Sequence, residues 1–146
     1  MTETPYVELH ASSAFSFLAG ASQPEALIER AAKIGMPAIA LADRNGLYGA
    51  ARFHTAARRL QVRAHIGAEI AVQGIGNCLT PPVWVPHQCP QEPPRLVLLC
   101  ASQTGYQNLC QLITRMKMRE TSKAEGAATL DDLEEFAAGL ICRISR

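Results

Sequence analysis

Residues 38–42 read Ala-Ile-Ala-Leu-Ala, an apolar run without a single polar side chain. A strand with one face in solvent alternates polar and apolar residues, whereas a parallel strand covered on both faces does not. Helix-like segments with apolar side chains at helical spacing flank this run at residues 24–33 and 47–60. The run therefore predicts a buried parallel strand in a β-α-β-α-β arrangement, with neighbouring strands at residues 6–9 and 63–72.

The second half of the chain continues the pattern. Residues 95–101 and a segment from residue 139 predict a fourth and a fifth strand, and residues 105–117 between them predict a helix with a buried apolar stripe. Residues 73–94 hold six of the nine prolines, which excludes a regular helix there. A linker between domains is the simplest interpretation of this Pro-rich segment, but strands on both sides favour an elaborated loop inside one domain spanning residues 1–146.

Side-chain hydroxyls mark the predicted helix starts. Ser22, Thr104 and Thr129 each precede a helix-like segment and can cap it. Gly35 is the expected stop of the first helix, because glycine tolerates the left-handed conformation that ends helices.

Composition limits the classes of function. Charged residues make up 18% of the chain and the net charge is +1, so no overall basic surface argues for direct nucleic-acid binding. The five cysteines contain no C-x-x-C pair, which argues against a disulfide framework. No amino-terminal apolar segment and no membrane-length apolar run occur, so we expect a cytoplasmic protein without membrane contact.

Polar side chains stand where the first three predicted strands end. His10 follows the first strand, Asp43 follows the second, and Glu69 lies in the third. Because the carboxyl ends of parallel strands meet at one edge of a sheet, we expect these three side chains to lie close together. Histidine and carboxylates bind the divalent metals that activate water or hold phosphate. The pattern predicts one wall of a metal-dependent phosphoesterase site.

Several ordered motifs resemble the polymerase and histidinol phosphatase (PHP) domain. Residues 6–22 are similar to its opening ELHxHSxFSFLDGAS, residues 41–49 to LTDHDGLYG, and residues 66–69 to IGAE. Residues 96–109 are similar to LxLLAxxxxGYxNL of bacterial DNA polymerase III alpha subunits, and the chain most resembles their error-prone branch. The resemblance covers essentially the whole chain and implies an α/β fold, a parallel (β/α) TIM-like barrel of the PHP type.

The barrel implied by this resemblance is incomplete. About five strands are present, whereas a closed barrel of this type needs about seven or eight. Three explanations remain open: the chain is a fragment, a partner completes the barrel, or the sheet is open.

The resemblance also implies that metal ligands have been lost. The second opening histidine of the family falls on Ser12, the carboxylate of LDG on Ala19, and the histidine of TDHDG on Arg44. A further histidine at the start of the fourth strand would fall near Arg95. A guanidinium has no lone pair to donate and does not deprotonate, so a working multi-metal site is not expected.

His10 and Glu69 are the remnant metal ligands that the resemblance implies. His10 is alternatively a plain strand-end histidine, and Glu69 is alternatively half of an ion pair with Arg44, whose charge would substitute for that of a metal. Asp43 is expected to cap the turn into the following helix. We assign no catalytic residue and expect no cofactor with this ligand set, although the family uses divalent metals such as zinc or manganese.

The favoured hypothesis is the N-terminal PHP segment of an error-prone DNA polymerase III alpha-type subunit, which is itself catalytically inactive. The parent would synthesise DNA in replication and damage-tolerant repair. The segment would contact the remainder of the subunit and other polymerase components, and DNA only indirectly. A stand-alone metal-dependent PHP phosphoesterase and a non-enzymatic interaction module, docking through the Pro-rich segment, are the alternatives.

Overall fold

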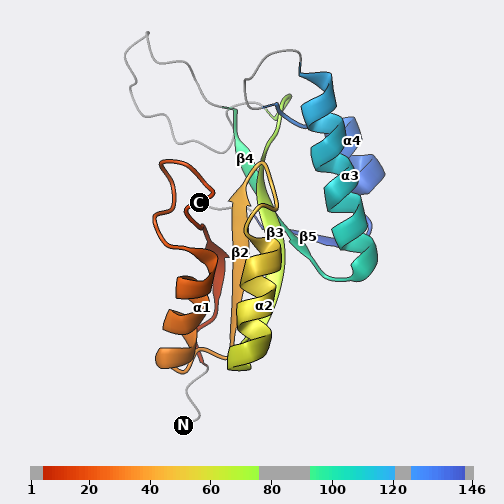
Figure 1. The fold of residues 1–146 in the computed structure, drawn as a ribbon. Helices are drawn as coiled ribbons and strands as arrows, with labels where there is room; N and C mark the ends of the chain where they lie inside the picture. The colour runs from red at the N-terminus through yellow and green to blue at the C-terminus, as the bar shows by residue number, and fades with distance from the viewer. Residues whose placement is uncertain (1–4, 76–92, 121–125, 144–146) are drawn as a thin grey trace.

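The computed structural model describes residues 5–75, 93–120 and 126–143, and its elements are shown in Figure 1. In chain order, they are β1 (Glu8–Ala11), α1 (Pro24–Lys33), β2 (Ala38–Arg44), α2 (Ala50–Leu60), β3 (Arg63–Ala71), β4 (Arg95–Cys100), α3 (Gln103–Arg119), α4 (Leu130–Phe136) and β5 (Leu140–Arg143).

The five strands form one sheet in the order β1-β2-β3-β4-β5. β1, β2 and β3 are parallel, as expected from the helices α1 and α2 between them. β4 is antiparallel to β3 and to β5, so the expectation of a sheet parallel throughout is wrong at β4. A parallel crossover ordinarily needs an intervening helix. The sequence of the connection, with six prolines in residues 73–94, does not favour such a helix. The result is a mixed α/β fold with a mostly parallel sheet.

α1 and α2 cover the first half of the sheet. Their apolar residues pack with β2 in one core cluster, which includes Ile28, Leu41 and Phe53, all 2% exposed or less. α1 begins after Gln23, which makes no side-chain cap, so Ser22 is not its cap; Pro24 fits the first turn because its missing N–H would have no partner there. Gly35 has the predicted left-handed backbone, with φ of 70°.

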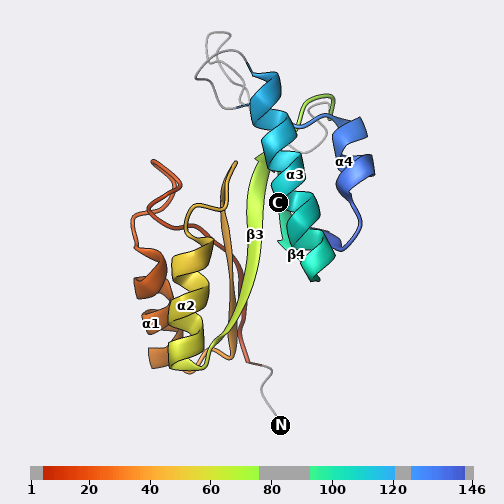
Figure 2. The same ribbon diagram turned by 45° about the vertical axis from the view of Figure 1, so that its right-hand side comes forward.

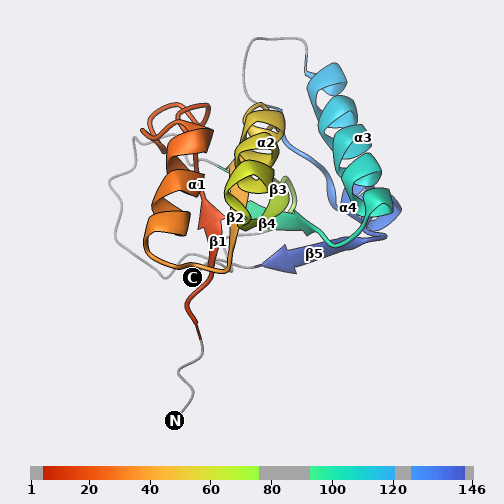
Figure 3. The same ribbon diagram turned by 60° about the horizontal axis from the view of Figure 1, so that its bottom comes forward.

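α3 and α4 cover β3 and β4 on the same side of the sheet, as Figures 2 and 3 show. The predicted stripe of α3 is confirmed: Leu109, Leu112 and Met116 are buried against the sheet. The cap of α3 is Ser102 rather than Thr104, since the Ser102 hydroxyl accepts a hydrogen bond from the Gly105 N–H at 3.1 Å. Thr129 caps α4 as predicted, in a reciprocal capping box with Asp132.

A smaller cluster lies on the opposite face of the sheet. Ala40 and Ala42 of β2 pack there with Val97 and Leu99 of β4, across β3. Gly67 makes this contact possible, because a Cβ at this position would lie 2.7 Å from the Leu99 side chain and 2.4 Å from the Leu98 carbonyl oxygen. β3 is continuous through Gly67.

No helix in the described residues is long and apolar enough to cross a membrane.

Candidate functional site

The ends of β1, β2 and β3 bring His10, Arg44 and Glu69 together. Arg44 and Glu69 are direct register partners on adjacent parallel strands. The Glu69 Oε2 lies 3.4 Å from the Arg44 Nε, and its Oε1 lies 3.9 Å from the His10 Nε2. The carboxylate of Glu69 therefore sits between a guanidinium and an imidazole. The structure places His10 and Glu69 at one end of the sheet, as the strand-end positions predict.

The three side chains are only partly open to solvent. Their exposed fractions are 15% for Glu69, 24% for His10 and 32% for Arg44. The Arg44 Nε is buried and has no hydrogen-bond partner among the described residues, although Glu69 is close by. The contact between Arg44 and Glu69 is therefore mainly electrostatic, and it neutralises a carboxylate that burial would otherwise penalise.

Asp43 lies at the same end of β2 but on the other face of the sheet. Successive side chains along a strand point to opposite faces, so Arg44 faces Glu69 while Asp43 faces the side of the helices. The expectation that Asp43 joins His10 and Glu69 is therefore wrong, because it used strand ends without strand alternation.

The Asp43 carboxylate anchors the loop between β1 and α1. It is 1% exposed and accepts hydrogen bonds from the Ser13 N–H at 2.8 Å, from the Ser13 hydroxyl at 2.9 Å and from the Ser16 hydroxyl at 2.7 Å. We expected this carboxylate to cap the turn into the following helix. Its hydrogen bonds in the described part of the chain run back to residues 13 and 16 instead.

Asn45 is a further structural residue at this end of the sheet. It is 4% exposed, and its backbone is left-handed with φ of 47°. Its N–H donates to the Glu69 carbonyl at 2.9 Å, and its side-chain oxygen accepts from the Ala71 N–H at 3.0 Å. Asn45 thus extends the ladder between β2 and β3 just beyond Glu69. The preference of asparagine for left-handed turns was the available signal.

The other expected ligand positions offer little to a metal. The Ser12 hydroxyl donates to the Ala42 carbonyl at 3.5 Å, and Ala19 has no donor atom. Arg95 is the first residue of β4 and pairs in register with Ala71. Throughout residues 5–75, 93–120 and 126–143, no group of three or more His, Cys, Asp or Glu side chains could hold a metal ion. The residues at the strand ends do not fit a divalent metal.

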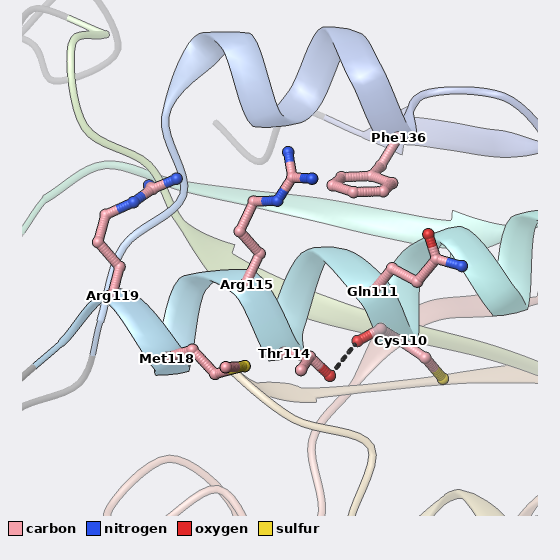
Figure 4. Close-up of a pocket in the computed structure, with 7 residues that line it drawn as sticks. All are labelled: Cys110, Gln111, Thr114, Arg115, Met118, Arg119 and Phe136. Carbon is pink, nitrogen blue, oxygen red and sulfur yellow. Dashed lines mark hydrogen bonds between the residues drawn. The ribbon is translucent and has the colours of Figure 1, made fainter.

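A hollow lies on the outer surface of α3 and α4, away from the strand ends (Figure 4). Arg115 lies 4.6 Å from the centre of the Phe136 ring and pairs with Glu135, while Arg119 makes two hydrogen bonds of 2.8 Å to Asp132. The Arg119 guanidinium, helped by Thr129, holds the pKa of the Asp132 carboxyl well below its usual range. Both arginines already have carboxylate partners, so we interpret this hollow as a structural feature and not as a binding site.

A comparison with protein families identifies the chain. Residues 8–145 match the model of the PHP domain. The chain belongs to the PHP domain family. At its strand ends, this PHP domain holds His10, Arg44 and Glu69.

The relatives of this PHP domain are error-prone DNA polymerases. It is 41% identical over 145 residues to the error-prone DNA polymerase of Anaeromyxobacter sp. (strain K), and 39% identical over 138 residues to that of Mycolicibacterium paratuberculosis. These alignments cover 95% and 94% of the chain and 12% of each polymerase. The chain thus matches the N-terminal region of these polymerases and spans about an eighth of their length, which confirms the resemblance carried by the sequence motifs.

Solved structures share the fold. A proposed metal-dependent phosphoesterase from Bifidobacterium adolescentis superposes with a TM-score of 0.53 at 17% identity. An amidohydrolase from Chromobacterium violaceum, with bound sulfate and no metal, superposes with a TM-score of 0.54 at 22% identity. Each comparison covers 77% of this chain and 33% of the other. At these identities the likeness extends to the fold alone.

Proposed function

We propose that this chain is a structural, non-catalytic PHP segment at the N-terminus of an error-prone DNA polymerase III alpha-type subunit. The observation that carries the proposal is the Glu69 carboxylate, which faces Arg44 on one side and His10 on the other. A metal bridged by this carboxylate would have to share its oxygens with a permanent cation. Repulsion between two cations at such short range, among partly buried side chains, is worth roughly several kcal/mol.

Arg44 is the proposed substitute for the charge of a metal. In the family, divalent ions such as zinc or manganese would join strand ends through shared carboxylates. Here the guanidinium of Arg44 on β2 pairs with the carboxylate of Glu69 on β3. The Chromobacterium violaceum amidohydrolase contains sulfate and no metal. It supports the proposal that a fold of this kind can persist without metal.

The fold is proposed to be part of a TIM-like barrel. β1 and β5 are the two ends of the sheet in the described residues. The similar solved structures are about three times as long as the matched region, since that region covers 33% of them. The remaining strands of a barrel would pair at these two ends.

The proposed partners follow from the parent protein. They are the remainder of the alpha subunit and other polymerase components, in the cytoplasm and without membrane contact. DNA is contacted only indirectly, since the net charge of +1 offers no general attraction for phosphate. Residues 1–146 act as one domain in this proposal, and the Pro-rich residues 73–94 lie mostly outside the described part of the chain.

Isothermal titration of the unmodified chain with zinc and with manganese tests the proposal. We expect no tight, stoichiometric binding and no hydrolysis of p-nitrophenyl phosphate in the presence of either ion. Tight binding together with hydrolysis would support the alternative, a stand-alone metal-dependent phosphoesterase. Tight binding alone would show that Arg44 does not replace the metal.

A further inference from the structure

The loop between β1 and α1 carries two adjacent apolar side chains that nothing in the described structure covers. Phe17 is 82% exposed and Leu18 is 91% exposed. Single exposed apolar residues are common on protein surfaces, but two large neighbours at a loop tip are an unusual concentration. In Figure 1 this loop lies beyond the ends of β1 and α1.

The base of the same loop is buried and tightly bonded. Ser13 and Ser16 are at most 1% exposed and both donate to Asp43. The Ala14 N–H donates to the Ser22 carbonyl at 2.8 Å, which closes the loop on itself. The tip is therefore held by a rigid base and is not the end of a loosely attached segment.

The tip itself has a conformation that its residue type disfavours. Leu18 has φ of 62°, in the left-handed region that side chains with a Cβ rarely adopt. The turn is fixed by hydrogen bonds from the Ala19 and Gly20 N–H groups to the Ser16 carbonyl, at 2.9 and 3.0 Å. A Cβ on Gly20 would lie 2.3 Å from the Ser13 carbonyl oxygen, so the loop closes only with glycine there. Strain of this kind is found where a fixed side-chain position has a use.

The chemistry of the loop indicates an apolar partner. Residues 11–22 contain no charged side chain, so the loop itself offers no charge for an acidic surface or a nucleic-acid phosphate to pair with. Two large apolar side chains on a backbone that is already fixed lose less conformational entropy on binding than side chains on a flexible loop. Residues that anchor protein interfaces share this property. The polymerases related to this chain extend far beyond it, because the match spans only 12% of their length.

We propose that Phe17 and Leu18 insert into an apolar recess on the part of the error-prone polymerase that lies beyond this PHP segment. The proposal rests on the proposed function, since it takes the polymerase polypeptide as the partner. Asp43 then has a defined purpose: it holds the loop so that the two side chains are presented ready to bind.

Photocrosslinking tests the contact directly. This chain replaces the matching N-terminal residues of the Anaeromyxobacter sp. polymerase, and p-benzoylphenylalanine replaces Phe17. A matched control carries the same group at Ile34, which is 53% exposed at the end of α1. We expect position 17 to crosslink to peptides outside residues 1–146, and more strongly than position 34. The proposal would be overturned if position 17 crosslinks only within residues 1–146 or to a second copy. It would also be overturned if position 17 crosslinks no more strongly than position 34.

A pair of substitutions separates docking from folding. Asparagine accepts left-handed backbone, so Phe17→Ser with Leu18→Asn should leave the Tm of the isolated chain unchanged or raised. In the chimeric polymerase the same pair should lower the Tm by several degrees. Equal effects in the chain and the chimera would overturn the inference while leaving the proposed function intact. A chimera with the unsubstituted chain that folds but synthesises no DNA would overturn the proposed function, and this inference with it.

Discussion

The Arg44 Nε lies 3.4 Å from the Glu69 Oε2, and the two residues pair in register at the ends of adjacent parallel strands. A guanidinium has no lone pair to offer a metal and does not deprotonate, so this contact is an ion pair in which Arg44 is the counter-ion of Glu69. His10 lies on the other side of the same carboxylate, with its Nε2 3.9 Å from the Glu69 Oε1.

Restoring the lost ligands together should recover metal binding. Ser12→His, Ala19→Asp and Arg44→His supply three donors next to His10 and Glu69. Because ligands act as a set around one ion, we expect the triple variant to bind zinc or manganese at least ~10-fold more tightly than any single variant, an increment of ~1.4 kcal/mol. Isothermal titration measures it. The matched control is Arg44→Lys in place of Arg44→His, which keeps the cation and should not bind; equal affinities in the two backgrounds would contradict the argument.

Removing the cation alone should destabilise the fold. In Arg44→Gln, the partly buried Glu69 carboxylate keeps His10 as its one ion-pair contact among the described residues. We expect the free energy of unfolding to fall by about 2 kcal/mol, between the ~0–1 kcal/mol of an exposed ion pair and the ~3–5 kcal/mol of a buried charge left unpaired. Urea unfolding checks this value.

Two further variants test whether the loss of stability comes from leaving the Glu69 carboxylate unpaired. Arg44→Gln combined with Glu69→Gln should recover most of the loss, because no charge is left unpaired. Arg52→Gln removes the more exposed pair with Glu25 and should cost ~0–1 kcal/mol at most. If Arg44→Gln costs no more than Arg52→Gln, Arg44 does not serve as the counter-ion of Glu69.

The parts of this structure that sequence could predict are those set by local pattern. The apolar run of β2 and the stripe ending in Met116 on α3 depend only on periodicity, and both were found. The proximity of His10 and Glu69 follows from the parallel order of β1 to β3. The direction of β4 was missed, because it depends on a connection rather than on the strand itself. The partners of Asp43 were missed because serines that are distant in sequence supply its hydrogen bonds.

Asp43 should control the order of the loop that carries Phe17 and Leu18. Asp43→Ala leaves three buried donors on Ser13 and Ser16 without their acceptor. We expect a loss of at least ~3 kcal/mol in the free energy of unfolding, since each of the three buried donors without a partner costs ~1–3 kcal/mol. Hydrogen exchange should show faster exchange of amides in residues 13–20. The exposed Asp131→Ala is the control, and equal exchange in both variants would contradict the anchoring role.

Acid should weaken the packing of α4 against α3 through Asp132. The pKa of Asp132 is lowered in the folded chain, mainly by hydrogen bonds from Arg119. A carboxyl whose folded pKa lies below its unfolded value of ~3.9 stabilises the fold above that value, and this contribution is lost as the pH falls toward the folded pKa. We expect the free energy of unfolding to fall between about pH 5 and pH 2, and to fall less steeply in Asp132→Asn. Parallel pH slopes for the two proteins would show that Asp132 does not contribute.

The edge of the sheet at β5 should make the isolated chain self-associate. β5 is the last strand of the sheet in the described residues, it pairs only with β4 there, and its Ile141 is 56% exposed. An apolar edge strand presents free backbone donors and acceptors to another chain, and a lysine on the edge blocks that pairing. Ile141→Lys should therefore shift the chain toward monomer in light scattering at increasing concentration. Leu130→Lys, at a residue 51% exposed on α4, is the matched control and should leave association unchanged. If the unsubstituted chain stays monodisperse at high concentration, the β5 edge is protected from pairing with another chain. No partner would then be needed to cover this edge of the barrel.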